Sequence, residues 1–166
     1  YLKDGEFGVC SRNMDLIESS ENAYWQIART TDLENKLRLL GKNIAIQGEL
    51  IGQGIQSNKY HLTTRELYVY NIYDIDAHEY YTFQEACDLV HQIRLYFVPG
   101  ISPSMRLKEL GRLEDLIKYS NEKSLINPDV MREGIVIRSV DNIYIHKFGR
   151  FSFKVLNPNW LLKYEE

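Results

Sequence analysis

Two charged residues interrupt apolar segments near the end of the chain. Glu133 stands in the segment 133–139 beside alternating isoleucines, and Lys154 stands in the segment 151–156 among phenylalanine, valine and leucine. Burying one charge alone costs several kcal/mol, so each residue needs a counter-ion, a metal ion or a ligand. A structural salt bridge and a ligand-binding site both remain open from these residues alone.

Three further residues could act on a ligand. Arg12 lies in a Ser-Arg-Asn triplet, Glu49 lies on the polar side of the alternating segment 43–51, and Tyr70 lies in the Tyr-rich segment 66–75. Each type also has an ordinary structural explanation. These are a surface arginine, an exposed edge-strand glutamate and a core tyrosine.

The elements that must position these residues follow from apolar spacing. We predict a hairpin over 1–10 with its turn at Asp4-Gly5, a helical segment over 21–40 that Thr30-Thr31 can interrupt, and strands over 43–51 and 66–75. Thr82 and Glu85 form a capping box for a helix whose apolar stripe runs to Phe97, before Pro99-Gly100.

The second half of the chain has weaker signals. Four residues at helical spacing, Leu107, Leu110, Leu113 and Ile117, predict a third helix, and a polar loop follows over 120–129. Strands over 133–140, 142–147 and 151–156 are expected to form an antiparallel meander. Strands in runs with helices between them predict an α+β fold built on antiparallel sheet.

Composition limits the class of protein. The chain has 166 residues, 44% hydrophobic and 26% charged, with a formal net charge of −3, which indicates a globular protein rather than one that binds nucleic acid by bulk basicity. The charge is nevertheless uneven, because residues 142–163 carry cations and no carboxylate, whereas 74–88 carry carboxylates and no lysine or arginine. Cys10 and Cys87 are too few for a disulfide framework. With no apolar run of membrane-spanning length and no signal peptide, these features predict a cytoplasmic protein without a membrane partner.

Five segments in one order carry a family resemblance. They are GVCSRN (8–13), AIQGELIGQGIQSNKY (45–60), YVYNIYDI (68–75), REGIVIRS (132–139) and FSFKVLNPNWLLK (151–163). Together they resemble the motif series of covalent nucleotidyltransferases, and most nearly the nick-sealing branch of the ATP-dependent RNA ligases. The resemblance implies one adenylation domain over 1–166, with the ATP-grasp-like α+β fold of the ligase and mRNA-capping superfamily.

The resemblance also implies roles for the candidate residues. Lys154 and Arg12 match residues that contact the nucleotide phosphates, and Tyr70 matches the aromatic residue that stacks on adenine. Glu133 and Glu49 match carboxylates that contact the nucleotide or a divalent metal ion. The implied catalytic set is thus Lys154, Glu133 and Arg12, the ATP-binding set is these three with Glu49 and Tyr70, and the metal ligands are Glu49 and Glu133. The implied cofactors are ATP and Mg²⁺ or Mn²⁺.

One element of the family pattern has no counterpart. Relatives carry the nucleophilic lysine in a Lys-x-Asp-Gly motif upstream of the Ser-Arg-Asn triplet. Lys3-Asp4-Gly5 lacks the intervening residue and is better explained as the hairpin turn. We therefore expect an N-terminally truncated domain, with the nucleophile and a further domain preceding Tyr1, and no self-adenylation by this chain alone.

The implied activity is the joining of RNA 3′-hydroxyl and 5′-phosphate ends through lysyl-AMP and 5′-adenylylated intermediates. RNA ends or a nicked duplex are the expected partners. DNA ligation, GTP-dependent capping and a non-catalytic nucleotide- or RNA-binding module remain alternatives.

Overall fold

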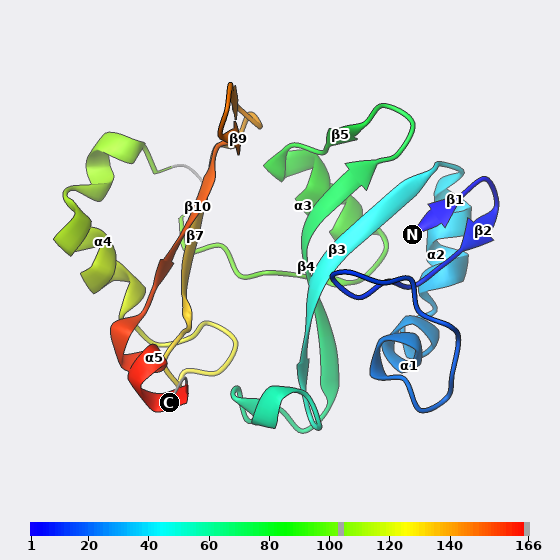
Figure 1. Ribbon diagram of the computed structural model, residues 1–166, viewed down its shortest axis with the longest axis horizontal. Coiled ribbons are helices and arrows are strands. Elements are labelled where there is room, and N and C mark those ends of the chain that lie inside the picture. The colour runs from blue at the N-terminus through cyan, green and yellow to red at the C-terminus, as the bar shows by residue number, and fades with distance from the viewer. Residues whose placement is uncertain (103–104, 165–166) are drawn as a thin grey trace. The chain divides into compact units, whose positions relative to one another are not determined.

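The computed structural model describes residues 1–102 and 105–164 (Figure 1), and the chain divides into two compact units. Unit 1 comprises Tyr1–Asn58 and Leu62–Val98, and unit 2 comprises Lys59–His61 and Pro99–Glu166. Helices and antiparallel strands occur in both, which confirms the α+β class. Both cysteines are free thiols. Within the described ranges, no helix has the length and apolar character needed to cross a membrane.

The sheet of unit 1 has six strands in the order β2-β1-β3-β4-β5, with β6 paired to β4. All pairs are antiparallel except β4 with β6. The predicted Asp4-Gly5 hairpin is confirmed, since both turn residues have φ near the left-handed region, 50° and 81°. The strand bounds are β1 Leu2–Lys3, β2 Glu6–Phe7, β3 Ile44–Gly52, β4 Arg65–Asp74, β5 Glu79–Tyr80 and β6 Tyr96–Phe97.

Three helices of unit 1 contribute side chains to its core. They are α1 (Ala23–Thr30), α2 (Leu33–Leu40) and α3 (Phe83–Gln92), and a short 3-10 turn η1 spans Gln56–Asn58. Leu37 of α2, Val90 of α3 and Ile72 of β4 belong to one cluster of buried side chains. The interruption expected near Thr30-Thr31 is confirmed, because Asp32 separates α1 from α2 with φ +54°.

The capping box of α3 is present, but its apolar stripe does not remain helical to Phe97. The helix ends at Gln92, Arg94 has φ +53°, and Phe97 lies in β6. The prediction that Pro99-Gly100 ends the helix is therefore wrong. Helical and strand spacing cannot be separated over a few apolar residues, and the edge of β4 is available for pairing.

Unit 2 departs twice from the expected elements. The third helix is divided at Gly111, φ +73°, and the predicted meander is instead a ribbon of β7 and β10 with the hairpin β8–β9 between them. A meander would pair consecutive strands, but the register joins Gly134–Arg138 to Ser152–Leu156. The bounds are η2 Leu107–Leu110, α4 Leu113–Ser120, β7 Gly134–Arg138, β8 Tyr144–Ile145, β9 Gly149–Arg150, β10 Ser152–Leu156 and α5 Pro158–Tyr164.

Candidate functional site

Glu133 and Lys154 form an ion pair in unit 2. Lys154 lies at the middle of β10 opposite Val136, and its Nζ donates to Oε1 of Glu133, which immediately precedes β7. Their side chains are 49% and 40% exposed. Each charge has a counter-ion, which is one of the three kinds of partner expected, but neither charge is buried, because Lys154 occupies an exposed position in the alternating pattern of β10. A pair this exposed contributes little to stability and costs little to break, so both charges are accessible to a ligand.

A buried side chain that we did not single out from the sequence fixes the position of Glu133. Asn157 is 0% exposed and its Nδ2 donates to the carbonyl of Arg132 at 2.8 Å. Its backbone N–H donates to the carbonyl of Glu133, also at 2.8 Å. The signal was available, because Asn before Pro is a typical N-cap, and Asn157 Oδ1 accepts from Asn159 N at 3.0 Å at the start of α5.

The guanidinium of Arg132 is a second anchor that sequence reasoning missed. Arg132 is 9% exposed, and it donates from Nε to the carbonyl of Ser120 at 3.4 Å and from Nη2 to the carbonyl of Tyr119. These contacts join the end of α4 to the start of β7. No pattern of spacing marks an arginine that binds carbonyls of a preceding helix, so this anchor could not be predicted.

Gly134 allows the two ribbon strands to approach each other beside Glu133. A Cβ built at this glycine would lie 2.2 Å from the carbonyl oxygen of Val155 in β10. Any larger residue would push the strands apart, because the obstructing atom belongs to the backbone. Glu133 is thus followed directly by a position at which β7 can accommodate only glycine.

Glu49 and Tyr70 lie on neighbouring strands of unit 1. Glu49 of β3 pairs with Tyr68 of β4 and is exposed, but the alternation of the strand is incomplete, because Ile51, two residues further on, is buried. The register shifts between Gln47 and Gly48, so Tyr70 is the extra residue of a β-bulge. Bulges re-aim side chains and are common at functional sites. Tyr70 is half-buried, so the sequence alone could not separate a ligand contact from a core residue.

An aromatic pair close to Glu49 in the sheet was also missed. Tyr68 stacks on Tyr96 of β6 with ring centroids 5.4 Å apart and planes 22° from parallel. Burial raises the pKa of Tyr68. The hydrogen bond that Tyr68 donates to Glu66 Oε2 at 2.8 Å raises it further. Tyr96 is 60% exposed. It joins this face only through the parallel pairing of β6 with β4, a long-range contact that no local pattern indicates.

Arg12 is exposed on a loop that is held at several points. Ser11 N donates to the carbonyl of Met14 at 2.8 Å, and Leu16 N donates to the carbonyl of Val9 at 2.9 Å, which closes the turn around Arg12. Trp25 Nε1 of α1 donates to the carbonyl of Leu16, also at 2.9 Å.

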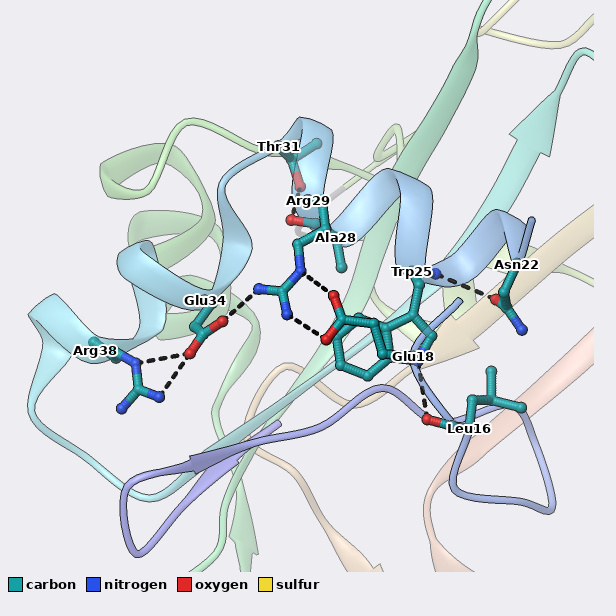
Figure 2. A network of polar contacts seen from close by, with 9 residues as sticks. All are labelled: Leu16, Glu18, Asn22, Trp25, Ala28, Arg29, Thr31, Glu34 and Arg38. Atoms are coloured by element: carbon teal, nitrogen blue, oxygen red, sulfur yellow. Dashed lines mark hydrogen bonds and ion pairs between the residues drawn. The ribbon is translucent and has the colours of Figure 1, made fainter. Parts of the chain in front are cut away.

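Ion pairs continue this attachment, as Figure 2 shows. Arg29 of α1 binds Glu18 through two hydrogen bonds of 2.7 and 2.8 Å and also pairs with Glu34 of α2, which in turn binds Arg38. The loop of Arg12 is thereby attached to both helices.

The candidate residues therefore fall into three groups. Glu133 and Lys154 are in direct contact in unit 2, Glu49 and Tyr70 lie on adjacent strands of unit 1, and Arg12 lies on a separate loop of unit 1. Over residues 1–102 and 105–164, no group of three or more His, Cys, Asp and Glu side chains could hold a metal ion. The arrangement offers phosphate-binding cations, carboxylates and stacking rings.

The sequence of the chain matches a known protein family. The family model described as RNA ligase matches residues 1–156. The chain belongs to the RNA ligase family. No match was found among curated proteins.

Solved structures of one ligase resemble this RNA ligase family chain closely. A variant of the Naegleria gruberi RNA ligase with ATP and Mn is 34% identical, with a TM-score of 0.87 over 100% of this chain and 48% of that one. The Naegleria gruberi enzyme with pyrophosphate is 35% identical, with a TM-score of 0.88 over 99% and 47%. A further variant with AMP and Mn is 35% identical, with a TM-score of 0.87 over the same shares. The chain thus spans about half the length of these ligases.

Proposed function

We propose that this chain supplies the nucleotide pocket of an ATP-dependent RNA ligase that joins RNA 3′-hydroxyl and 5′-phosphate ends. The observation that carries the proposal is the accessible Lys154–Glu133 pair. Glu133 is followed by Gly134, where the strand has no room for a side chain, and the buried amide of Asn157 holds the backbone next to Glu133. Membership of the RNA ligase family supports the same conclusion. The single adenylation domain over 1–166 and the cytoplasmic location belong to the proposal.

Each candidate residue has a role in this proposal. Lys154 contacts the α-phosphate, and its charge favours the deprotonated form of a nearby nucleophilic lysine. Arg12 contacts the phosphate groups of the nucleotide and of the RNA end. The ring of Tyr70 stacks on adenine, because the bulge can re-aim it from the core toward a ligand.

Glu133 and Glu49 are the proposed carboxylate ligands of Mg²⁺ or Mn²⁺. Mg²⁺ is usually held by one or two carboxylates, with water and substrate phosphates completing its coordination. The absence of a three-ligand cluster in the described ranges is compatible with that mode. Bound metal and ATP supply charge neutralisation, the AMP group and the pyrophosphate leaving group.

The ligands of the solved ligases support the use of ATP. The Naegleria gruberi structures contain ATP with Mn, AMP with Mn, and pyrophosphate. AMP and pyrophosphate are the two parts into which adenylyl transfer divides ATP.

The proposal is tested by calorimetric titration of this chain with ATP and Mg²⁺. We expect Lys154→Ala and Glu133→Ala to weaken ATP binding at least about 10-fold, because each removes a charged contact worth about 1.5–3 kcal/mol. Lys118→Ala, at an exposed lysine of α4, is the matched control and should leave ATP affinity unchanged.

Two outcomes would contradict this proposal. One is no ATP binding by the unmodified chain, and the other is unchanged ATP affinity in both variants. A competition with GTP separates ligase from capping chemistry, since GTP binding tighter than ATP binding favours capping. Intact mass after incubation with ATP should show no added AMP, because the chain contains no Lys-x-Asp-Gly motif.

A further inference from the structure

The hairpin between β7 and β10 has a defined backbone. Phe148 N donates to the carbonyl of Ile145 at 3.0 Å, and Phe151 N donates to the carbonyl of Ile143 at 2.7 Å. Arg150 Nη2 donates to Asn142 Oδ1 at 2.6 Å across its base. In Figure 1 the hairpin, labelled β9, stands at one end of the ribbon of β7 and β10.

The tip of this hairpin is apolar and exposed. Every residue from 143 to 148 is exposed, including Tyr144 at 77%, Phe148 at 87% and Ile143 at 54%. A two-stranded hairpin gains no core from these side chains. Large rings gathered on an exposed element indicate a surface for a partner.

The charges around the rings indicate the chemistry of that partner. Lys147 and His146 lie between Tyr144 and Phe148 in sequence, Arg150 follows, and residues 142–163 contain no carboxylate. Lys147 is exposed and forms no ion pair with any residue of 1–102 and 105–164. Flat apolar rings beside cations are complementary to the bases and phosphates of a single nucleic acid strand.

The hairpin is also within reach of Lys154. Lys154 follows Phe148 by six positions, so their Cα atoms lie at most about 20 Å apart, a span of about six stacked nucleotides. A strand whose reacting end is at Lys154 can therefore extend to the hairpin.

We propose that the hairpin 142–150 binds a single-stranded segment of RNA, with bases stacked on Tyr144 and Phe148 and a phosphate at Lys147. The choice of RNA rests on the proposed function. Stacking on the rings and attraction to Lys147 apply to a single strand of any nucleic acid.

Fluorescence anisotropy with a labelled 12-nucleotide oligouridine tests this inference. We expect the double variant Tyr144→Ala/Phe148→Ala to raise the Kd for the strand at least about 10-fold, because two stacking platforms are lost. The control is Leu113→Ala/Leu162→Ala, which removes side chains of unit 2 that are 64% and 75% exposed, and it should leave the Kd unchanged. Lys147→Gln should reduce the slope of log K against log salt by about 0.7.

Several results would overturn the inference. They are an unchanged Kd in the double variant, an equal loss of affinity for a blunt RNA duplex, and a dimer of the unmodified chain that the double variant converts to monomer with RNA affinity intact. Absence of RNA binding by a chain that binds ATP overturns the inference and leaves the nucleotide pocket standing. RNA binding that depends on the hairpin in a chain that binds no ATP supports the inference and contradicts the proposed function. Circular dichroism of each variant verifies folding.

Discussion

Asn157 shows how a neutral side chain can position charged ones. Its amide binds the carbonyl of Arg132, and its oxygen accepts from the N–H groups of Asn159 and Trp160 at 3.0 and 3.4 Å. One buried residue therefore connects the residue before Glu133 to the first turn of α5. Removing it leaves buried backbone groups without partners, which costs more than the bonds themselves contribute.

We expect Asn157→Ala to lower the free energy of unfolding by about 2–3 kcal/mol. Asn159→Ala is the control, because the Asn159 side chain bonds Asn121 at an exposed position and should cost at most about 1 kcal/mol. Urea denaturation monitored by circular dichroism measures both. Equal losses in the two variants would show that Asn157 has no special role.

Tyr70 gives a residue-scale test of stacking. Tyr70→Ala should weaken ATP binding about 5- to 100-fold, since stacking on a base contributes about 1–3 kcal/mol. Tyr70→Phe keeps the ring and should retain ATP affinity. Calorimetric titration distinguishes the outcomes, and loss of affinity in the Phe variant would assign the role to the hydroxyl instead.

At the scale of elements, the junction of α1 and α2 carries the loop of Arg12. Glu34 accepts hydrogen bonds from Arg29 and Arg38, which lower its pKa below the ordinary value of 4.5, and the larger effect comes from Arg29. A carboxylate whose pKa is lowered by folding stabilises the protein above its unfolded pKa, and this contribution is lost as pH falls through the folded pKa.

The corresponding prediction concerns Glu34→Gln. At pH 7 the variant should be less stable than the parent by about 1 kcal/mol, as expected of a partly exposed network. As pH falls from 4.5 through the lower pKa of the folded state, the difference should shrink, because the parent carboxylate becomes protonated. Urea titrations between pH 7 and pH 3 measure the difference, and a gap that is constant or grows toward low pH would contradict the assignment.

Local signals predicted elements well where caps and turns marked them. Asp4-Gly5, the capping box of Thr82 and the break near Thr31 are all confirmed. Prediction failed where long-range pairing decides the structure. Phe97 lies in β6, which pairs with β4, and not in the predicted helix. The strand after the hairpin 142–150, β10, pairs with β7 and not with β9, which precedes it in sequence.

The same division applies to the site. Matching the sequence to the motifs of RNA ligases selected five residues: Lys154, Glu133, Glu49, Tyr70 and Arg12. Of these, Lys154 and Glu133 are in contact in the structure. Neither Arg132 nor Tyr96 could be predicted, because each acts through a contact with a distant segment.

At the scale of the whole molecule, the acidic and cationic segments lie in different units, and each unit contains one buried tryptophan. The acidic segment 74–88 lies in unit 1 and the cationic segment 142–163 in unit 2, so the net charge of −3 is the sum of segments of opposite sign in different units. Each unit also contains one of the two tryptophans, Trp25 in unit 1 and Trp160 in unit 2, which are 6% and 1% exposed.

This placement predicts separate unfolding signals. Asn157→Ala should lower the urea midpoint reported by Trp160 fluorescence in a Trp25→Phe background. It should leave the midpoint reported by Trp25 in a Trp160→Phe background unchanged, because the lost contacts are internal to unit 2. Equal shifts in both backgrounds would show that the units unfold as one.

The accessible ion pair of Lys154 and Glu133 has a consequence for selectivity against background anions. Under the proposed function, an inorganic phosphate or sulfate ion competes with Glu133 for the ammonium group of Lys154, and it offers nothing to Glu133 in return. A nucleoside triphosphate that arrives with its metal ion provides a new partner for both members of the pair. A nucleoside triphosphate with its metal ion is thereby favoured over a small anion by the number of partners it offers, and not by the strength of the ion pair, which costs little to break.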